Sequence, residues 1–438
     1  MSLRSYLDEL ERLNETEVVT TIADTRFEIA GVLKALENRP VHFRNVPGCE
    51  FSVAGNLLAS KEGIARHFGI EVDRLIQWIA KGIDQPSPPR RVRSAPCQEV
   101  EMNEIDLDRL PILLHGHDDG GRYITSGVCV ARHPDLGQNL DFHRAMQIGK
   151  DRLALRIVRH RDFDRFLRDQ QEMDVAICIG NGPNVLLAAA TSVAGGGDEL
   201  EIANTLEALD VTRAKSADLW IPADCEIVLE GKVRLDDRAS EGPFVDLTET
   251  LDVVRTEPVM TVTRITHRRD AIWQALLPGG LEHKLLMGMP REPTIYRNVR
   301  EAGVNCRDVS ITPGGCSWLH AIIKIRKTGD DDVAKALDAA FAGHRSLKHA
   351  FVVDEDIDIL DPIAVEWAFA TRFQFDRDVY PREIEAGSSL DPSAEPGTKR
   401  TAKVGFDLTV PSGTESAREK FEHARFPRVD LKRFLDRQ

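Results

Sequence analysis

Long apolar runs are missing from this sequence of 438 residues. A membrane-spanning helix needs about 18 or more consecutive apolar residues, and no such stretch occurs. The first residues, MSLRSYL, also lack the apolar core of a signal peptide. We therefore expect a cytoplasmic protein without a membrane partner.

Basic residues are fewer than acidic residues in this sequence. The chain has 57 Lys and Arg against 71 Asp and Glu, a formal net charge of −14. Nucleic acids and anionic membrane surfaces both demand clustered positive charge. The excess of acidic residues therefore argues against a nucleic-acid or membrane partner and favours a protein that acts on small molecules. With 42% hydrophobic and 29% charged residues the composition is that of an ordinary globular protein, and the length allows two or three domains.

Cysteine is scarce, and the usual metal motifs are lacking. The seven cysteines are scattered and form no Cys-x-x-Cys pair: Cys49, Cys97, Cys129, Cys178, Cys225, Cys306 and Cys316. This pattern predicts neither a zinc site nor a disulfide framework, but reduced and mostly buried thiols. No His-x-His or His-Glu-x-x-His motif occurs either, which argues against a metal-dependent hydrolase.

Two carboxylates lie in the segment RASEGPFVDLT, residues 238–248. Glu241 and Asp246 are five positions apart, and on a regular helix or strand such side chains do not share a face. The Gly242-Pro243 turn between them can bend the chain so that they converge. A carboxylate pair does acid–base work when a cation and a water-poor pocket separate the two pKa values. Taken alone, the string is more typical of a solvated surface turn.

A second segment, NLDFHRAMQ, supplies the cation as Arg144 on an expected strand. In this order, Asn139-x4-Arg144 and Glu241-Gly-Pro-Phe-x-Asp246 resemble the UbiD family of reversible decarboxylases, which use prenylated FMN. The resemblance covers roughly residues 105–380. It implies that a flavin prenyltransferase supplies the cofactor and that the chain forms a homo-oligomer.

The resemblance also implies a division of roles in catalysis. Loss of carbon dioxide from an aromatic carbon leaves charge that the ring cannot delocalise, so a cofactor must act as the electron sink. Arg144 would orient the substrate acid and keep Glu241 ionised. Asp246 would donate the proton that replaces the departing carboxylate. These three are the expected catalytic residues.

A divalent ion, Mn²⁺ or Mg²⁺, would bridge the flavin phosphate, with K⁺ left open as a further ion. The resemblance assigns its ligands to Asn139, His160 and Glu199. Glu201 stands two positions from Glu199 and is the alternative. A lone histidine such as His160 is, without family context, more often a solvated or core residue.

Further cofactor contacts follow from the same resemblance. They are assigned to Arg144, Gln147, Thr191 and Lys348. The alternative for Lys348 is an ordinary surface lysine. Two departures from the family pattern leave the flavin contacts and the pocket floor open: Thr191-Ser192-Val193 replaces a loop that often contains proline, and Glu249-Thr250 replaces a frequent Gly-Tyr.

His283 and Arg291 lie about two helical turns apart in an expected helix over residues 281–301. They could face one cavity and bind the second carboxylate of a diacid. This is similar to the heteroaromatic-acid branch of the family, so furan-2,5-dicarboxylate, giving 2-furoate, is the first expected substrate. Pyrrole-2-carboxylate or a hydroxybenzoate are alternatives, as is a non-catalytic flavin-binding protein of the same fold. Arg291 could instead cap a helix or form a subunit salt bridge.

The chain reads as an α+β protein of three parts. An N-terminal α/β lobe, residues 1–104, ends in a Pro/Arg-rich connector at 85–96. Residues 105–304 carry strands at 225–230, 258–267 and 271–276 and would form a flavin-binding domain with a connecting helix. The resemblance implies a split β-barrel of the flavin-reductase type here. Residues 305–438 form a C-terminal α/β lobe, whose tail after 385 is expected to pack loosely or against a neighbouring subunit.

Overall fold

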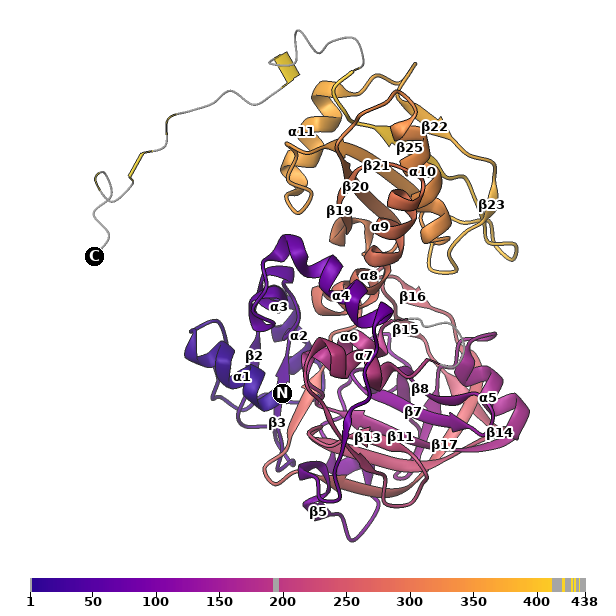
Figure 1. Cartoon of the computed structure of the whole chain (residues 1–438). Coiled ribbons are helices and arrows are strands. Elements are labelled where there is room, and N and C mark those ends of the chain that lie inside the picture. The colour runs from indigo at the N-terminus through magenta and orange to yellow at the C-terminus, as the bar shows by residue number, and fades with distance from the viewer. Residues whose placement is uncertain are drawn as a thin grey trace.

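The computed structural model of the protein describes residues 2–191 and 197–411 and a few isolated positions beyond. Three regions follow one another along the chain in Figure 1. The N-terminal lobe lies beside a large central sheet, and the orange C-terminal lobe is set off above both. The connection between the last two regions runs through α8 (Leu281–Gly288) and α9 (Glu292–Glu301).

The N-terminal lobe surrounds a four-stranded sheet of order β1-β2-β3-β18. Its strands are β1 (Glu17–Val19), β2 (Val41–Phe43), β3 (Ser52–Gly55) and β18 (Ile272–Ala275). Its helices are α1 (Leu3–Arg12), α2 (Glu28–Ala35), α3 (Lys61–His67), η1 (Val72–Arg74) and α4 (Leu75–Asp84). Helix α1 begins at a capping box in which Ser2 and Ser5 satisfy each other's backbone N–H groups. It buries Leu3, Leu7 and Leu10, as their helical spacing requires.

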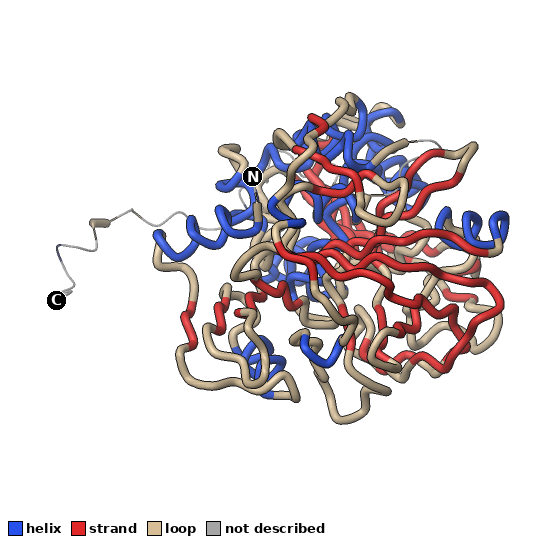
Figure 2. Tube along the Cα trace, turned by 90° about the horizontal axis from the view of Figure 1, so that it is seen from below, coloured by secondary structure: helices blue, strands red, loops and turns tan. Residues whose placement is uncertain are grey.

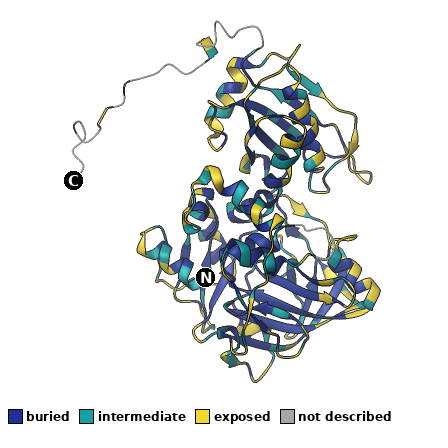
Figure 3. Cartoon of the chain, in the orientation of Figure 1, coloured by how far each residue is buried: buried dark blue, intermediate teal, exposed yellow. Residues whose placement is uncertain are grey.

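The central region is a nine-stranded, antiparallel sheet of order β6-β9-β10-β17-β14-β11-β7-β8, with β5 paired to β17. Its strands are β5 (Val100–Glu101), β6 (Tyr123–Ile124), β7 (Val128–His133), β8 (Gly137–Phe142), β9 (Ala145–Gln147), β10 (Arg152–Leu155), β11 (Glu172–Ile179), β14 (Ile227–Glu241) and β17 (Arg255–His267). Figure 2 shows the long strands side by side, and Figure 3 shows that most of the sheet is buried. Within the described residues the pairing runs as one path from β6 to β8, and no pairing of these two ends is recorded.

Smaller elements cover this sheet. They are η2 (Pro96–Gln98), η3 (Leu107–Arg109), α5 (Asp162–Gln170), α6 (Pro183–Ala189), α7 (Glu199–Leu206), a sheet of β4 (Arg90–Arg91), β12 (Asp210–Arg213) and β13 (Trp220–Pro222), and a hairpin of β15 (Phe244–Val245) and β16 (Leu251–Asp252). The Pro/Arg-rich connector is mainly extended, as expected, and β4 inside it pairs in parallel with β12. Its Arg90 forms an ion pair with Asp210, so the connector is fixed to the central region.

The C-terminal lobe is a five-stranded sheet of order β19-β20-β21-β25-β22 flanked by helices. Its elements are η4 (Met289–Arg291), β19 (Cys306–Ile311), η5 (Pro313–Gly315), β20 (His320–Ile325), α10 (Asp332–Gly343), β21 (His349–Asp354), α11 (Pro362–Arg372), β22 (Val379–Pro381), β23 (Glu385–Ala386), β24 (Arg400–Thr401) and β25 (Val404–Asp407). Pro290 and Pro293 interrupt the helix expected over 281–301, which breaks into α8, η4 and α9.

Two sequence expectations about strands are wrong. Strand β18 does not complete the central sheet but pairs in parallel with β3 of the N-terminal lobe. The described part of the region after 385 is not wholly loose, because β25 lies between β21 and β22, while most of residues 412–438 lie outside the described residues. Both strands are short, and a short strand pattern predicts an extended segment without predicting its neighbour. Among the described helices, none combines the length and apolarity needed to cross a membrane.

Candidate active site

The candidate site lies where the end of β14 meets the loop between β8 and β9. Glu241 is the last residue of β14, and Arg144 directly precedes β9. The β15–β16 hairpin then follows β14 and folds back over the same place with Asp246 and Asp252. The Gly242–Pro243 peptide bond is cis, and Gly120 packs against this turn so closely that a Cβ would lie 2.1 Å from the Gly242 oxygen.

Arg144 and Glu241 form a bidentate pair. Arg144 Nε donates to Glu241 Oε1 at 2.8 Å, and Nη2 donates to Oε2 at 3.1 Å. Glu241 is fully buried, and the side chain of Arg144 is 12% exposed. A buried carboxylate requires such a partner, because unpaired charge is strongly disfavoured away from water.

The same guanidinium reaches two more carboxylates. Its Nη1 lies 3.4 Å from Asp246 Oδ2, and its Nη2 donates to Asp252 Oδ2 at 2.9 Å. The turn has therefore brought Glu241 and Asp246 to one cation, although they are five positions apart in sequence. Arg255 also donates to Asp252, so two arginines face three carboxylates here. Asp246 is the most loosely held of the three and is 24% exposed.

Tyr123 of β6 supports the buried carboxylate from the other side. Its hydroxyl donates to Glu241 Oε1 at 3.1 Å and accepts the N–H of Gly242 at 3.0 Å. Its ring packs against Phe244 with centroids 4.0 Å apart, and Arg144 lies 5.2 Å from the Phe244 centroid. The hydroxyl thus fixes both the carboxylate and the turn that follows it.

Burial and neighbouring charges shift the pKa values of three side chains in this cluster. Burial opposes the charge of Arg144, but the hydrogen bond and charge of Glu241 outweigh it and raise the pKa of the guanidinium. Burial, followed by the charge of Glu241, raises the pKa of the Tyr123 hydroxyl. Tyr123 therefore stays a neutral hydrogen-bond donor. Burial opposes ionisation of Asp252 too, but hydrogen bonding from Arg255 and the charge of Arg144 lower its pKa overall.

His283 on α8 is the second expected group near the acids. Its Nδ1 accepts the backbone N–H of Gly279 at 3.0 Å, so a neutral ring carries its proton on Nε2. Burial lowers its pKa, and the negative charge of Asp246 acts in the opposite direction. The positive charges of Arg144 and Lys284 lower the pKa of His283 further.

Arg291 lies at the end of η4, where the charge of a second arginine, Arg161, acts on it. Burial lowers its pKa to about 10, and the charge of Arg161 contributes in the same direction. Its guanidinium lies 5.8 Å from the ring of Trp318. Arg161, which follows His160, was not singled out in the sequence.

Asn139 and Glu199 come together although 60 residues separate them. Glu199, at the start of α7, accepts the backbone N–H of Leu140 on β8 at 2.9 Å. Burial raises the pKa of its carboxyl to about 8. The Asn139 amide nitrogen is buried without a hydrogen-bond partner. The Glu199 carboxyl is an oxygen ligand of the kind that a divalent cation takes, whereas the unsatisfied Asn139 N–H is a donor that suits an acceptor such as a phosphate oxygen.

The other residues that were expected to contact the cofactor form contacts in different parts of the fold. His160 is exposed, with a positive φ of 65°, and its backbone N–H donates to Asp164. Gln147 donates to Asp108 on η3 at 2.8 Å. Lys348 pairs with Asp391 at 3.1 Å within the C-terminal lobe.

Thr191, at the end of α6, is buried and donates to the Leu187 oxygen at 2.9 Å. The rest of that loop, Ser192 and Val193, lies outside the described residues. Within the described chain no cluster of three or more His, Cys, Asp or Glu side chains could hold a metal ion. A divalent ion at Asn139 and Glu199 would therefore need further ligands, such as a phosphate or His160.

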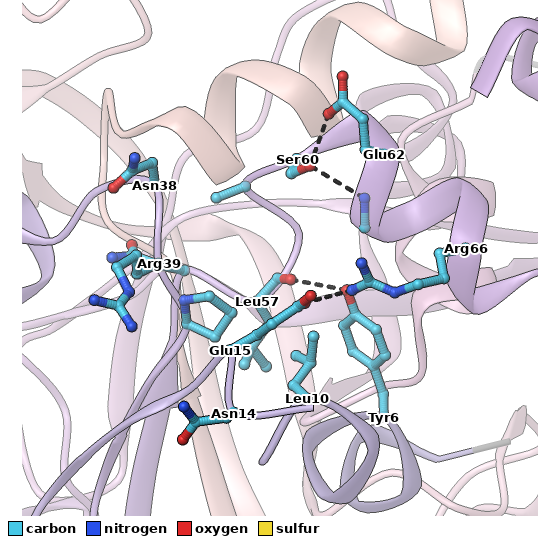
Figure 4. Close-up of a pocket in the computed structure, with 14 residues that line it drawn as sticks. Tyr6, Leu10, Asn14, Glu15, Asn38, Arg39, Leu57, Ser60, Glu62 and Arg66 are labelled. Atoms are coloured by element: carbon cyan, nitrogen blue, oxygen red, sulfur yellow. Dashed lines mark hydrogen bonds and ion pairs between the residues drawn. The ribbon is translucent and has the colours of Figure 1, made fainter. Parts of the chain in front are cut away.

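A separate pocket of about 320 Å³ lies in the N-terminal lobe between α1 and α3 (Figure 4). Tyr6 donates to the Leu57 oxygen there, and Arg66 pairs with Glu15. These polar groups satisfy one another, and none of the residues assigned to catalysis lines this pocket. It does not belong to the candidate active site.

Sequence reasoning missed Tyr123, Asp252, Arg255 and Arg161. Asp252 was within reach, because it lies six residues after Asp246 in the same acidic segment. Tyr123 stands in an ordinary strand pattern, so nothing local marks it.

Comparison with known proteins shows the class. Three sequence families described as parts of 3-octaprenyl-4-hydroxybenzoate carboxy-lyase match the chain: an N-terminal domain at residues 7–83, a Rift-related domain at 90–281 and a C-terminal domain at 284–408. With the buried arginine–carboxylate cluster, these matches define a carboxy-lyase, an enzyme of decarboxylation. The chain belongs to the UbiD family.

Its relatives are similar over nearly their whole length. An anhydromevalonate phosphate decarboxylase of Methanothermobacter thermautotrophicus is 42% identical over 96% of this chain and 99% of the relative. One from Methanosarcina mazei is 39% identical over 98% and 100%. Among solved structures, the UbiD-class enzyme HmfF of Pelotomaculum thermopropionicum in complex with FMN has a TM-score of 0.95 at 35% identity, covering 99% of this chain and 100% of that chain.

Proposed function

We propose that this enzyme decarboxylates anhydromevalonate phosphate. The observation that carries the proposal is the similarity to enzymes of that name, from 42% to 32% identity in five relatives that align over most of their length. The substrate combines a carboxylate next to a double bond with a phosphate at its far end. We assign one guanidinium to each anionic end of this molecule.

Arg144 would receive the carboxylate end. It is buried, permanently charged and already oriented by Glu241 and Asp252. Arg291 would receive the phosphate end, because a guanidinium can donate two parallel hydrogen bonds to a phosphate, and Arg161 would add positive charge. The furan diacid expected from the sequence also carries an anion at each end, and it remains the second candidate.

Prenylated FMN is the proposed cofactor, supplied by a flavin prenyltransferase, and when bound it provides the electron sink that loss of carbon dioxide from an unsaturated carbon requires. Solved relatives bind FMN and prenylated FMN. Asn139, Glu199 and His160 would hold a Mn²⁺ or Mg²⁺ ion at its phosphate, with K⁺ as a further ion. Gln147, Thr191 and Lys348 would add contacts, Lys348 only after leaving Asp391.

The protein's own side chains would then bind the substrate carboxylate and transfer the proton. Arg144 binds and orients the carboxylate that leaves. Asp246, the least tightly held acid of the cluster, donates a proton to the carbon that has lost carbon dioxide. Glu241 and Tyr123 keep Arg144 in place during turnover. His283 stays neutral and presents its Nε2–H to the substrate.

Two structural features belong to the same proposal. The central sheet would be a split β-barrel that cradles the flavin, with domain boundaries near residues 104 and 304. The chain would act as a homo-oligomer, as an evolved dimeric form of HmfF illustrates for a relative.

The test is carbon dioxide release by protein co-produced with a flavin prenyltransferase. Anhydromevalonate phosphate, furan-2,5-dicarboxylate, pyrrole-2-carboxylate and a hydroxybenzoate are compared side by side. We expect the phosphate substrate to be preferred. Preference for the furan diacid would replace the substrate and keep the reaction. Inactivity on all four, with prenylated flavin bound, would overturn the proposal.

Arg291→Ala then tests the phosphate end. It should raise KM for the phosphate substrate by about 10-fold to 100-fold, because a charge-assisted contact is lost. It should change KM for a monoacid far less. Equal effects on both substrates would reject this role, and Lys232→Gln, which breaks an exposed ion pair with Glu172, is the control.

A further inference from the structure

Glu249 adopts a backbone conformation that does not suit its side chain. Its φ is +60°, in the left-handed region that glycine occupies most easily. It lies in the turn between β15 and β16, which carries Asp246. A strained residue persists where the surrounding contacts hold it in place.

The contacts that hold Glu249 are two lysines from other parts of the fold. Lys284 on α8 donates to Oε1, and Lys34 on α2 donates to Oε2 at 3.1 Å. The hydrogen bond from Lys284 is the main reason that the pKa of Glu249 is lowered. The side chain of Lys284 is only 11% exposed, whereas that of Lys34 is 51% exposed. Lys284 is therefore the stronger of the two partners.

The turn that Glu249 closes is the one that places Asp246. Glu249 N–H donates to the Asp246 oxygen at 2.8 Å, and Asp246 N–H donates to the Thr250 oxygen at 3.0 Å. The turn packs on Gly279, just before α8. A Cβ on Gly279 would lie 2.9 Å from Glu249 Cγ and 3.1 Å from the Asp246 oxygen. Gly279 also donates its N–H to His283.

We infer that Glu249 and Lys284 are positioning residues: their ion pair holds the turn bearing Asp246 against the start of α8, which bears His283. The pair joins two segments that each present a polar group to the site. This inference rests on the proposed role of Asp246 as proton donor. A proton donor must lie within hydrogen-bonding reach of the carbon, and small displacements reduce the rate strongly.

Stability alone does not account for Glu249. Glycine would fit the φ of this position better, and a half-exposed ion pair contributes little to folding. The side chain of Glu249 is 45% exposed. The arrangement is therefore better explained by the placement of Asp246 than by the stability of the fold.

Glu249→Gly is the decisive variant, because it removes the ion pair and relieves the backbone. We expect an unchanged or higher melting temperature and a kcat lowered about 10-fold to 100-fold, with KM changed by less than about 3-fold. Asp270→Gly is the matched control, since Asp270 has a φ of +53° in the turn between β17 and β18. Full kcat in Glu249→Gly would overturn the inference.

Exchanging the charges of Glu249 and Lys284 tests whether the ion pair itself is what kcat depends on. Lys284→Glu alone should lower kcat as Glu249→Gly does, and Glu249→Lys combined with Lys284→Glu should restore at least part of it. Lys34→Gln should have a small effect, because Lys34 is half exposed. A double variant no better than Lys284→Glu would count against the pair.

A readout without substrate separates this inference from the proposed function. In the protein without substrate, Glu249→Gly should speed amide hydrogen exchange in residues 246–252 and leave exchange in the C-terminal lobe unchanged. Unchanged exchange in the turn would overturn the inference even if the enzyme is active. Faster exchange in a chain that turns over no tested acid would support the ion pair and reject only the proposed substrate.

Discussion

Arg144 and Glu241 meet through two parallel hydrogen bonds of 2.8 and 3.1 Å at a fully buried strand end. Planar, bidentate contact is a property of the guanidinium that lysine lacks. Arg144→Lys should therefore keep the charge but lose the orientation, and lower kcat/KM by on the order of 100-fold or more. Steady-state kinetics and a melting curve check this, and wild-type kinetics would show that the geometry is not needed.

Asp246→Asn removes the acidic proton while keeping the size of the side chain. Positioned general acids contribute about 10² to 10⁴ in rate, so turnover should fall by that order. The flavin content, measured from the absorbance spectrum of the purified protein, should stay near that of the wild type. An active Asp246→Asn enzyme would exclude Asp246 as proton donor.

Tyr123→Phe leaves the Gly242 N–H without its acceptor beside the buried carboxylate. An unsatisfied buried donor costs about 1–3 kcal/mol, which urea unfolding can measure. The activity should fall as well, because Glu241 loses a hydrogen bond at 3.1 Å.

Tyr6→Phe is the matched control for this variant. It removes another buried hydroxyl, which donates to the Leu57 oxygen in the N-terminal lobe. We expect a similar loss of stability but normal kcat. If both variants lose stability and activity in proportion, the Tyr123 hydroxyl has no specific role in the site.

Glu199→Gln should reduce the amount of divalent metal that copurifies with the flavin-loaded enzyme. Loss of even an outer-shell partner lowers metal affinity by about 10-fold to 100-fold, and loss of a ligand should exceed that. Glu201→Gln is the control, because Glu201 is its neighbour on α7 and the Glu199 carboxyl is the one hydrogen-bonded to β8. Metal analysis decides between them, and a larger loss in Glu201→Gln would reverse the assignment.

We predict that His344 makes the free energy of unfolding depend on pH. Burial, aided by the charge of Arg291, lowers its pKa to about 4, and its Nε2–H donates to the Trp318 oxygen at 3.0 Å. The unfolded chain, with a histidine pKa near 6.5, binds the proton first as the pH falls. Stability is therefore fully present above pH 6.5 and is lost on descent towards pH 4, by about 2 kcal/mol at pH 5.

His344→Gln keeps a donor for Trp318 and does not titrate. The loss of unfolding free energy between pH 7 and pH 5 should therefore be smaller in this variant than in the wild type. Urea unfolding at the two pH values measures it. An equal loss in both proteins would show that His344 does not cause the dependence.

Much of the fold followed from local pattern. After residue 305 the sequence pattern predicts strands at 306–312, 319–326 and 349–354 and helices at 330–342 and 361–371. These agree within a few residues with β19, β20, β21, α10 and α11. Proline in a helix interior also predicts a kink at Pro290 and Pro293 in the helix over 281–301, and the helix divides there into α8, η4 and α9. These features depend on periodicity and on the missing proline N–H, which act over a few residues.

The family and the acid motif could be recognised from two short segments of the chain. Arg144, Glu241 and Asp246 were expected together from their residue types and order, and the structure brings both carboxylates to the one guanidinium around the Gly242-Pro243 turn. Only the tertiary structure decided that β18 joins the N-terminal sheet, that Tyr123 and Asp252 complete the cluster, and that Glu249 lies between two lysines. The reason is physical: each of these contacts joins segments distant in the chain, and their partners are chosen by packing and burial, which no local pattern encodes.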